Sequence, residues 1–190
     1  MLIPESNTNY ELLPVGTYQA TCIEFVHMGT QPTAHGPKNQ VRLAWEIAGE
    51  HMENGKPFIV SRLCTFSAHE KASFRAIVEG MIGGKLDKTF DTKALIGLTC
   101  LLSVQHNTNG ETTYVNVETA VPLPAGTKKP GHVSKLFYVS LDPAEFDEVV
   151  FRELPEKRQA KIGATSEWRK LVAILGKSPS ELMGGDSVPF

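Results

Sequence analysis

The chain has 190 residues, 41% of them hydrophobic and 21% charged, which is the composition of a globular protein with one extended domain or two small ones. No apolar run approaches the about 20 residues of a membrane-spanning helix, so we expect no such helix. The formal net charge of −2 excludes a strongly basic nucleic-acid-binding domain, although cations gathered on one face still bind a phosphate backbone.

Period-two patterns in the first part of the chain predict three β-strands. Residues 17–26 combine alternation with β-branched and aromatic side chains, and residues 40–47 alternate clearly. Between them, residues 29–39 are rich in glycine and proline, so we expect a long loop there. A turn at residues 53–57 leads to a third strand at residues 58–66. The side chains expected to share the core faces are Tyr18, Ala20, Cys22, Val41, Leu43, Trp45 and Ile47.

A helix is expected after the third strand. Ser67 is a suitable N-cap, and Glu70 follows three residues later, as a capping box requires. The glycine pair Gly83-Gly84 is expected to end this helix. Its apolar face is formed by Phe74, Ile77, Val78 and Met81.

Two further strands, at residues 100–106 and 112–117, are joined by Asn109-Gly110, a strong hairpin signal. The element order is therefore three strands, a helix and a two-stranded hairpin, which is the order of an OB-fold. We expect a mainly β protein with C-terminal helices, in which residues 1–124 form an OB-fold five-stranded barrel with a helix between strands 3 and 4. In such barrels the first loop and the hairpin loop grip single strands.

Residues 125–175 are expected to form a C-terminal strand and helical extension. A short strand is predicted at residues 136–141, followed by a helix at residues 142–154 that its first residue, an aspartate, caps. A second helix is predicted at residues 156–174, with a break near Gly163. These helices are expected to pack on the barrel or to mediate self-association.

Residues 176–190 are expected to be a flexible tail that ends in a peptide ligand. Pro189 limits the entropy lost on docking, Phe190 fits an apolar pocket, and the carboxylate after it fits an arginine or a backbone nest. This tip resembles that of bacterial single-stranded DNA-binding proteins, although Asp186 is the one acid close to it. The resemblance implies that the tail recruits replication or recombination proteins. The tail residues expected to bind such partners are Asp186, Val188, Pro189 and Phe190.

Several segments of the chain, read together, resemble a group of phage-encoded single-stranded DNA-binding proteins. They lie at residues 13–20, 45–47, 53–58, 66–75, 95–100, 114–117, 122–126, 146–155 and 166–168. The resemblance covers most of the chain. It implies an OB-fold that coats and protects single-stranded DNA during phage replication or recombination, in the cytoplasm of a bacterial host.

Single-stranded DNA is held by aromatic side chains under the bases and by cations along the phosphates. Arg42 is one position out of the apolar register of its strand, and Arg62 is out of register with Leu63, so we expect both arginines to face away from the core. A solvated strand face is the alternative for both. Phe66 and Tyr114 are expected to stack on bases, with core packing as the alternative.

Three basic residues outside the predicted strands complete the set of predicted DNA-binding residues. Lys38 lies in the first loop, and Lys71 and Arg75 are four residues apart on one helix face, where solubility is the alternative role. The predicted DNA-binding residues are Lys38, Arg42, Arg62, Phe66, Lys71, Arg75 and Tyr114.

Motifs for catalysis and for cofactors are not found. The six histidines show no metal-ligand spacing, and no Walker loop, dinucleotide fingerprint or nucleophile elbow occurs. His69-Glu70 sits at a helix start, where caps are far commoner than acid–base pairs. The odd set of Cys22, Cys64 and Cys100 has no CxxC pair, so we expect buried, reduced thiols.

We therefore expect a non-enzymatic, sequence-independent single-stranded DNA-binding protein without metal or cofactor. Two alternatives remain open. The first is a replication or recombination accessory protein that acts mainly through protein contacts. The second is a small metal-dependent nuclease.

Overall fold

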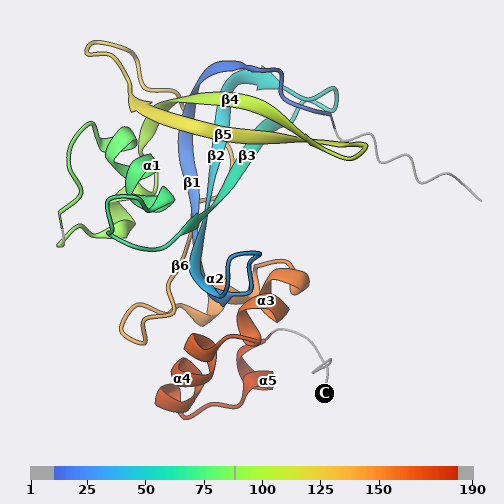
Figure 1. Ribbon diagram of the computed structural model, residues 1–190, viewed down its shortest axis with the longest axis vertical. Coiled ribbons are helices and arrows are strands. Elements are labelled where there is room, and N and C mark those ends of the chain that lie inside the picture. The colour runs from blue at the N-terminus through green and yellow to red at the C-terminus, as the bar shows by residue number, and fades with distance from the viewer. Residues whose placement is uncertain (1–10, 88, 184–190) are drawn as a thin grey trace, which may run out of the picture.

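Five antiparallel strands carry the fold in the computed structural model, which describes residues 11–87 and 89–183. Backbone pairing follows the order β3-β2-β1-β4-β5, and β6 joins β1 in parallel outside this path. The protein is therefore mainly β, with most of its helices toward the C-terminus (Figure 1). The strands are β1 (Gly16–Gln31), β2 (Lys38–His51), β3 (Pro57–Thr65), β4 (Thr99–Asn109), β5 (Thr112–Pro122) and β6 (Phe137–Val139).

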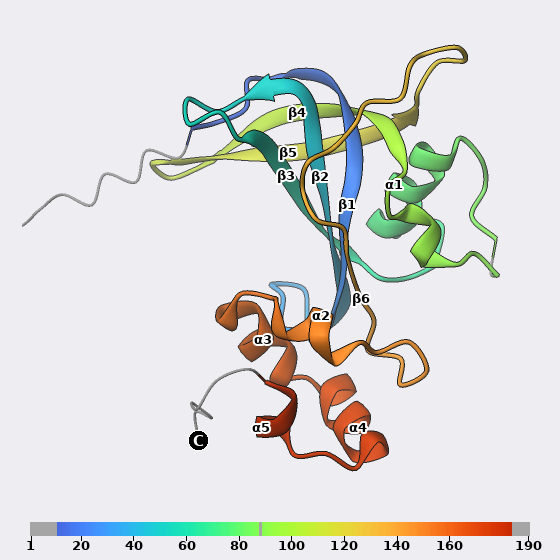
Figure 2. The same ribbon diagram turned by 180° about the vertical axis from the view of Figure 1, so that it is seen from behind.

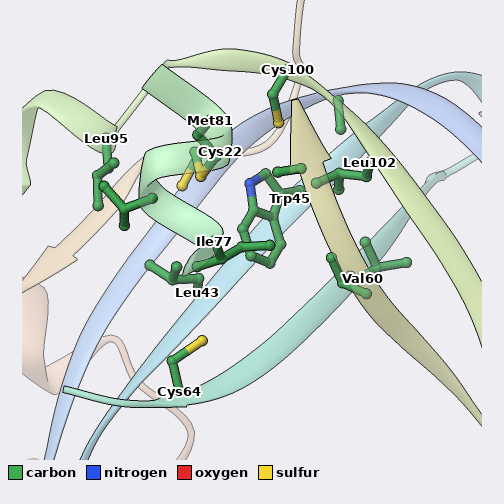
Figure 3. Close-up of a cluster of buried hydrophobic side chains, with 14 of the residues drawn as sticks. Cys22, Leu43, Trp45, Val60, Cys64, Ile77, Met81, Leu95, Cys100 and Leu102 are labelled. Atoms are coloured by element: carbon green, nitrogen blue, oxygen red, sulfur yellow. The ribbon is translucent and has the colours of Figure 1, made fainter. Parts of the chain in front are cut away.

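The predicted core face of the sheet is confirmed. Alternate residues of β2 turn their side chains into one hydrophobic cluster, in which Trp45 is fully buried. Figure 3 shows Trp45, Ile77 and Leu102, from a strand, a helix and a second strand, pointing into this cluster. The cysteines are free and buried, as predicted. The predicted core residues that are found buried are Ala20, Cys22, Val41, Leu43, Trp45 and Ile47, with Tyr18 packed against them.

The helix after β3 begins later than its predicted cap. Helix α1 (Ser73–Ile82) follows Ala72, which provides no side-chain cap, so the expected capping box of Ser67 and Glu70 is wrong. The Ser67 hydroxyl instead accepts a hydrogen bond from the backbone N–H of His69 in the turn before the helix. The apolar face is confirmed and lies in the core, and the short helix η1 (Thr92–Leu95) precedes β4. The buried residues of α1 are Phe74, Ile77, Val78 and Met81.

The expected long loop at residues 29–39 is shorter than predicted, because residues 29–31 belong to β1 and residues 38–39 to β2, which leaves residues 32–37 as the connection. Pairing continues through Gly29↔Gln40 and Gln31↔Lys38, so β1 and β2 form a long hairpin (Figure 1). Gly29 has a φ of +69°, and a Cβ built there would lie 2.7 Å from the Thr165 hydroxyl oxygen. Glycine is therefore needed at this position both for its backbone conformation and for the close approach of the C-terminal helices.

The first C-terminal helix begins later than predicted. Asp142 accepts a hydrogen bond from the backbone N–H of Ala144 in a turn, rather than capping a helix. Asp147 takes the capping role, because its side chain accepts from the backbone N–H groups at the start of α2 (Glu148–Arg152). The predicted break near Gly163 is confirmed, since it separates α3 (Glu156–Gly163) from α4 (Ser166–Leu175).

Part of the segment expected to be tail is folded. Helix α5 (Pro179–Leu182) begins with a capping box between Ser178 and Glu181, and Leu182 is fully buried. The predicted tail residues 186–190 lie outside the described residues. The C-terminal helices share a second hydrophobic cluster with the outer face of β1. This cluster contains Val26, Met28, Val139, Leu141, Phe151, Leu154, Ile162, Trp168, Leu171 and Leu182.

The segment between β5 and β6 crosses the outer surface of the sheet (Figure 2). Glu46, which is 5% exposed, holds this segment near the end that leads into β6. Its two carboxylate oxygens accept hydrogen bonds from the backbone N–H groups of Val133, at 2.9 Å, and Ser134, at 2.7 Å. These bonds outweigh the effect of burial, which alone would raise the pKa of Glu46, and they lower that pKa.

Arg62 links β3 and β5, the two ends of the strand order. Its Nη1 donates to the backbone carbonyl oxygens of Val117, at 2.8 Å, and Glu118, at 2.7 Å. The sheet is thus curled so that its first and last strands approach each other.

Candidate nucleic-acid interface

A groove of about 390 Å³ lies between the outer face of the sheet and helix α3. Helix α3 runs beside the lower part of the β1–β2 hairpin (Figure 1). Among the described residues that line the groove, the charged ones are all cations. The lining comprises Met28, Arg42, Ser61 and Leu63 from the strands, and Pro155, Lys157, Arg158 and Lys161 from the helical side.

Two arginines of the groove share one carboxylate. Glu24 accepts a hydrogen bond from Nη1 of Arg42, and both of its oxygens lie 3.2 Å from Nη1 of Arg158. All three side chains are largely buried, with exposures of 14% for Glu24, 21% for Arg42 and 20% for Arg158. A single negative charge between two positive charges leaves the cluster net positive, and a guanidinium stays protonated at any physiological pH.

The pKa of Arg158 is affected more by burial than by the neighbouring Glu24 carboxylate. Loss of water around the guanidinium lowers the pKa of Arg158, and the Glu24 carboxylate opposes this change. A partly desolvated guanidinium interacts more strongly with an incoming anion than a solvated one, because the local dielectric constant is lower. The groove thus holds preorganised donors suited to phosphate oxygens.

Helix α3 presents its cations to the groove because its other face is anchored. Ile162 is fully buried in the second cluster. Gln159 is 4% exposed, and its side-chain N–H₂ donates to the carbonyl oxygens of Arg152, at 3.1 Å, and Leu154, at 2.7 Å. Residues three or four apart share a helix face, so Lys157 and Lys161 lie on one side, away from this anchor.

The strand side of the groove offers apolar surface. Ile59 and Leu63 are 52% and 55% exposed on β3, and they share a face with Ser61. Leu63 lines the groove itself, and Ile59 continues the same face beyond it. Three cations on the helical wall, together with Arg42 and an exposed leucine on the strand wall, match a ligand that is both anionic and partly apolar.

Of the predicted DNA-binding residues, Arg42 lies in this groove and Arg62 does not. Arg62 pairs with the buried Leu43, and it turns inward with Val60 and Cys64 to reach the backbone of β5. Leu63, which was expected to face the core, faces outward instead. The prediction that Arg62 faces away from the core is therefore wrong.

Phe66 lies at a different site from the groove. Its ring packs edge-on against Phe25 and Phe74, with centroids 5.9 Å and 5.1 Å away, and it lines a separate pocket. Tyr114 is 55% exposed on β5, near the β4–β5 turn. Figure 1 shows this turn away from the C-terminal helices, and Tyr114 does not line the groove.

The remaining predicted cations do not line the groove. Arg75 pairs with Glu79 at 2.8 Å and donates to the carbonyl oxygen of Ala68, while Lys71 is exposed. Helix α1, which carries Arg75, and helix α3 lie on opposite sides of the hairpin in both views (Figures 1 and 2). Lys38 lies near the hairpin tip, opposite Gln31, whose side-chain amide donates to the carbonyl oxygen of the groove residue Lys161.

Sequence reasoning missed the cations of α3. Lys157 and Lys161 are spaced by four residues, the signal of one helix face, but the helix was interpreted as a packing or self-association element. The partner-binding residues Asp186, Val188, Pro189 and Phe190 lie outside the described residues.

Comparison with known proteins assigns no relative to the chain. No family model matches the sequence, and no curated protein matches it. Within residues 11–87 and 89–183, no group of three or more histidine, cysteine, aspartate or glutamate side chains is placed to hold a metal ion. In the same part of the chain, no helix is long and apolar enough to cross a membrane.

Proposed function

We propose that the protein binds single-stranded DNA without sequence preference, and coats and protects it during phage DNA replication or recombination in the cytoplasm of a bacterial host. The groove between β2, β3 and α3 carries this proposal. Four cations line it, and an exposed leucine lies beside them. The proposed role is binding without chemistry on the DNA, and it needs no cofactor.

The curled sheet supports an OB-type barrel as the architecture behind this role. The strand order β3-β2-β1-β4-β5, the position of α1 between β3 and β4, and the Arg62 link between β3 and β5 are the features of such a barrel. In OB-folds the face of strands 2 and 3 binds oligonucleotides. The groove lies on the outer side of these same strands.

Phosphates would lie along α3, and bases would lie toward β3. Arg42 and Arg158 offer planar donors to phosphate oxygens, and the lysines act as mobile point charges. Exposed Leu63 and Ile59 offer apolar surface to base faces. Since neither kind of contact reads base edges, affinity is expected to be nearly independent of sequence.

Replacing Lys157 and Lys161 together by alanine tests the proposal. Binding to oligo-dT and to mixed-sequence single strands should weaken alike. The log–log salt slope should become shallower by about 1.4, about 0.7 for each lost phosphate contact. Fluorescence anisotropy over a range of salt concentrations measures both quantities.

The matched control replaces two exposed lysines outside the groove, Lys56 and Lys170, by alanine. It removes the same total charge and should leave affinity and salt slope nearly unchanged. Equal effects of the two double variants, or no binding of single strands by the unmodified protein at low salt, would refute the proposed groove.

A further inference from the structure

A second pocket lies where the inner face of the hairpin meets the C-terminal extension. It has a volume of about 430 Å³, and it adjoins a smaller apolar hollow of about 230 Å³ that shares Phe66 and Thr92 with it. These sizes suit large side chains of a bound ligand. The proposed DNA groove is on the other face of β1, where Met28 lies.

Aromatic rings form the floor of this aromatic pocket. Tyr138 stacks on Phe25, with centroids 5.1 Å apart and planes at 18°, and Phe66 stands edge-on to Phe25. The Tyr138 hydroxyl lies 2.8 Å from the Thr92 hydroxyl and donates to Glu145 at 3.0 Å. The rings are therefore held in place before any ligand arrives, which lowers the entropic cost of binding.

Acidic residues surround the aromatic floor. Asp142, Glu145 and Glu167 line the pocket, and the lining histidine, His27, has its pKa lowered by burial, so it is neutral near pH 7. Lys93 pairs with Glu145 at 3.1 Å and balances one of the three negative charges. A phosphate backbone would be repelled here, whereas a cationic ligand would be attracted.

We infer that the aromatic pocket binds a segment of a partner protein in which one or two large apolar side chains are flanked by lysine or arginine. The two adjoining hollows would take the apolar side chains, and the acidic rim would pair with the cations. Residues 184–190 of the chain do not fit this description, because they contain no lysine or arginine and Asp186 is negative. The inference goes beyond the proposed DNA binding and does not depend on it.

The probe for this site is a fluorescein-labelled, amidated heptapeptide with two phenylalanines separated by glycine and flanked on each side by two lysines. It should bind the full-length protein, and peptides with serine for phenylalanine, or glutamate for lysine, should bind at least tenfold more weakly. Amide chemical shifts of Thr92 and Ser140, which line the pocket, should move on binding.

Two variants test the pocket without removing core side chains. Ala68→Trp fills the smaller hollow, and the pair Asp142→Asn and Glu145→Gln removes two rim charges while keeping side-chain size. Each should weaken peptide binding at least tenfold. Their affinity for oligo-dT should stay within twofold, while the Lys157→Ala and Lys161→Ala variant should bind the peptide normally.

The matched charge control replaces Glu111 and Glu118, exposed on β5 and its turn, by glutamine. This variant should bind the peptide like the unmodified protein. The inference is overturned if the peptide does not bind, if the serine peptide binds equally well, or if the β5 control weakens binding as much as the pocket variants. Displacement of the probe by a peptide of residues 184–190 would overturn the cationic partner in favour of the chain's own tail.

Discussion

Arg62 ties together two strands that are not neighbours in the sheet order. Register shifts between Ser103 and Val104 in the β4–β5 ladder, so Glu118 has no partner residue on β4. Such a bulge leaves backbone groups outside the ladder. The Arg62 guanidinium donates to the carbonyl oxygens of Val117 and Glu118 at this point, and thereby satisfies them.

Replacing Arg62 by alanine should therefore destabilise the fold. It removes two hydrogen bonds from a charged donor, so we expect the free energy of unfolding in urea to fall by about 1–3 kcal/mol. The salt slope of DNA binding should not change, because Arg62 lies outside the groove. Arg62→Lys should recover part of the loss, and unchanged stability in the alanine variant would contradict this role.

The sequence predicts the orientation of Arg42 but leaves that of Arg62 ambiguous. Around Arg42 one set of alternate positions is continuously apolar, so the register is unique. In β3 both sets contain large apolar residues, Ile59 and Leu63 in one and Phe58 and Val60 in the other. Tertiary contact with β5 decides between the two registers, and a local pattern does not contain that contact.

At the scale of elements, the hairpin tip is fixed by a carboxylate from α4. Glu167 accepts from the Thr30 hydroxyl at 2.6 Å and from the Thr30 backbone N–H at 3.0 Å. The side-chain amide of Gln31 adds a bond to the carbonyl oxygen of Lys161 at 3.1 Å. The first loop of the proposed barrel is therefore in direct contact with the C-terminal helices.

Loss of the Glu167 charge should loosen this contact. Burial alone would raise the pKa of Glu167, but the hydrogen bonds from Thr30 outweigh it and lower the pKa from 4.5 to about 2. A depressed pKa stabilises the folded state above pH 4.5, and this contribution is lost as the pH falls toward 2.

We expect Glu167→Gln to lower the free energy of unfolding by about 1–2 kcal/mol near pH 7. The difference from the unmodified protein should shrink steadily below pH 4.5, as urea unfolding at a series of pH values would show. A difference that stays constant with pH would mean that the charge of Glu167 contributes nothing.

Long strands were predictable, and their ends were not. The breakers at residues 29–39 indicate a loop, yet the pairing of β1 and β2 extends to Gln31 and Lys38, in a stretch where Thr30 is bonded to a residue 137 positions away. Likewise, the Ser67 cap is locally reasonable, but the helix starts at Ser73, whose hydroxyl accepts from the backbone N–H of Thr65. Contacts between distant segments override local propensity in both places.

At the scale of the whole molecule, the hairpin separates two sites of opposite charge. One face of β1 leads to the cationic groove, and the other leads to the acidic aromatic pocket. The order of elements predicts the strands that support the groove. The contribution of α3 could not be predicted, because it depends on how the C-terminal helices dock on the hairpin.

The groove is complete without the end of the chain, since its lining residues lie between positions 28 and 161. Deleting the last four residues, 187–190, should therefore leave affinity for oligo-dT within twofold, measured by anisotropy at moderate salt. Binding of tail-dependent partner proteins should be lost in the same variant. A large fall in DNA affinity would place the tail in the groove.

The second hydrophobic cluster also has a consequence for synthesis of the protein. Val26 and Met28 belong to the first strand to leave the ribosome, while most of the residues that cover them, from Val139 to Leu182, are translated last. During elongation the nascent hairpin therefore exposes an apolar face that nothing yet covers. Exposed apolar surface on a partly made chain attracts chaperones or aggregates, so slow translation of the final segment should lower the yield of folded protein.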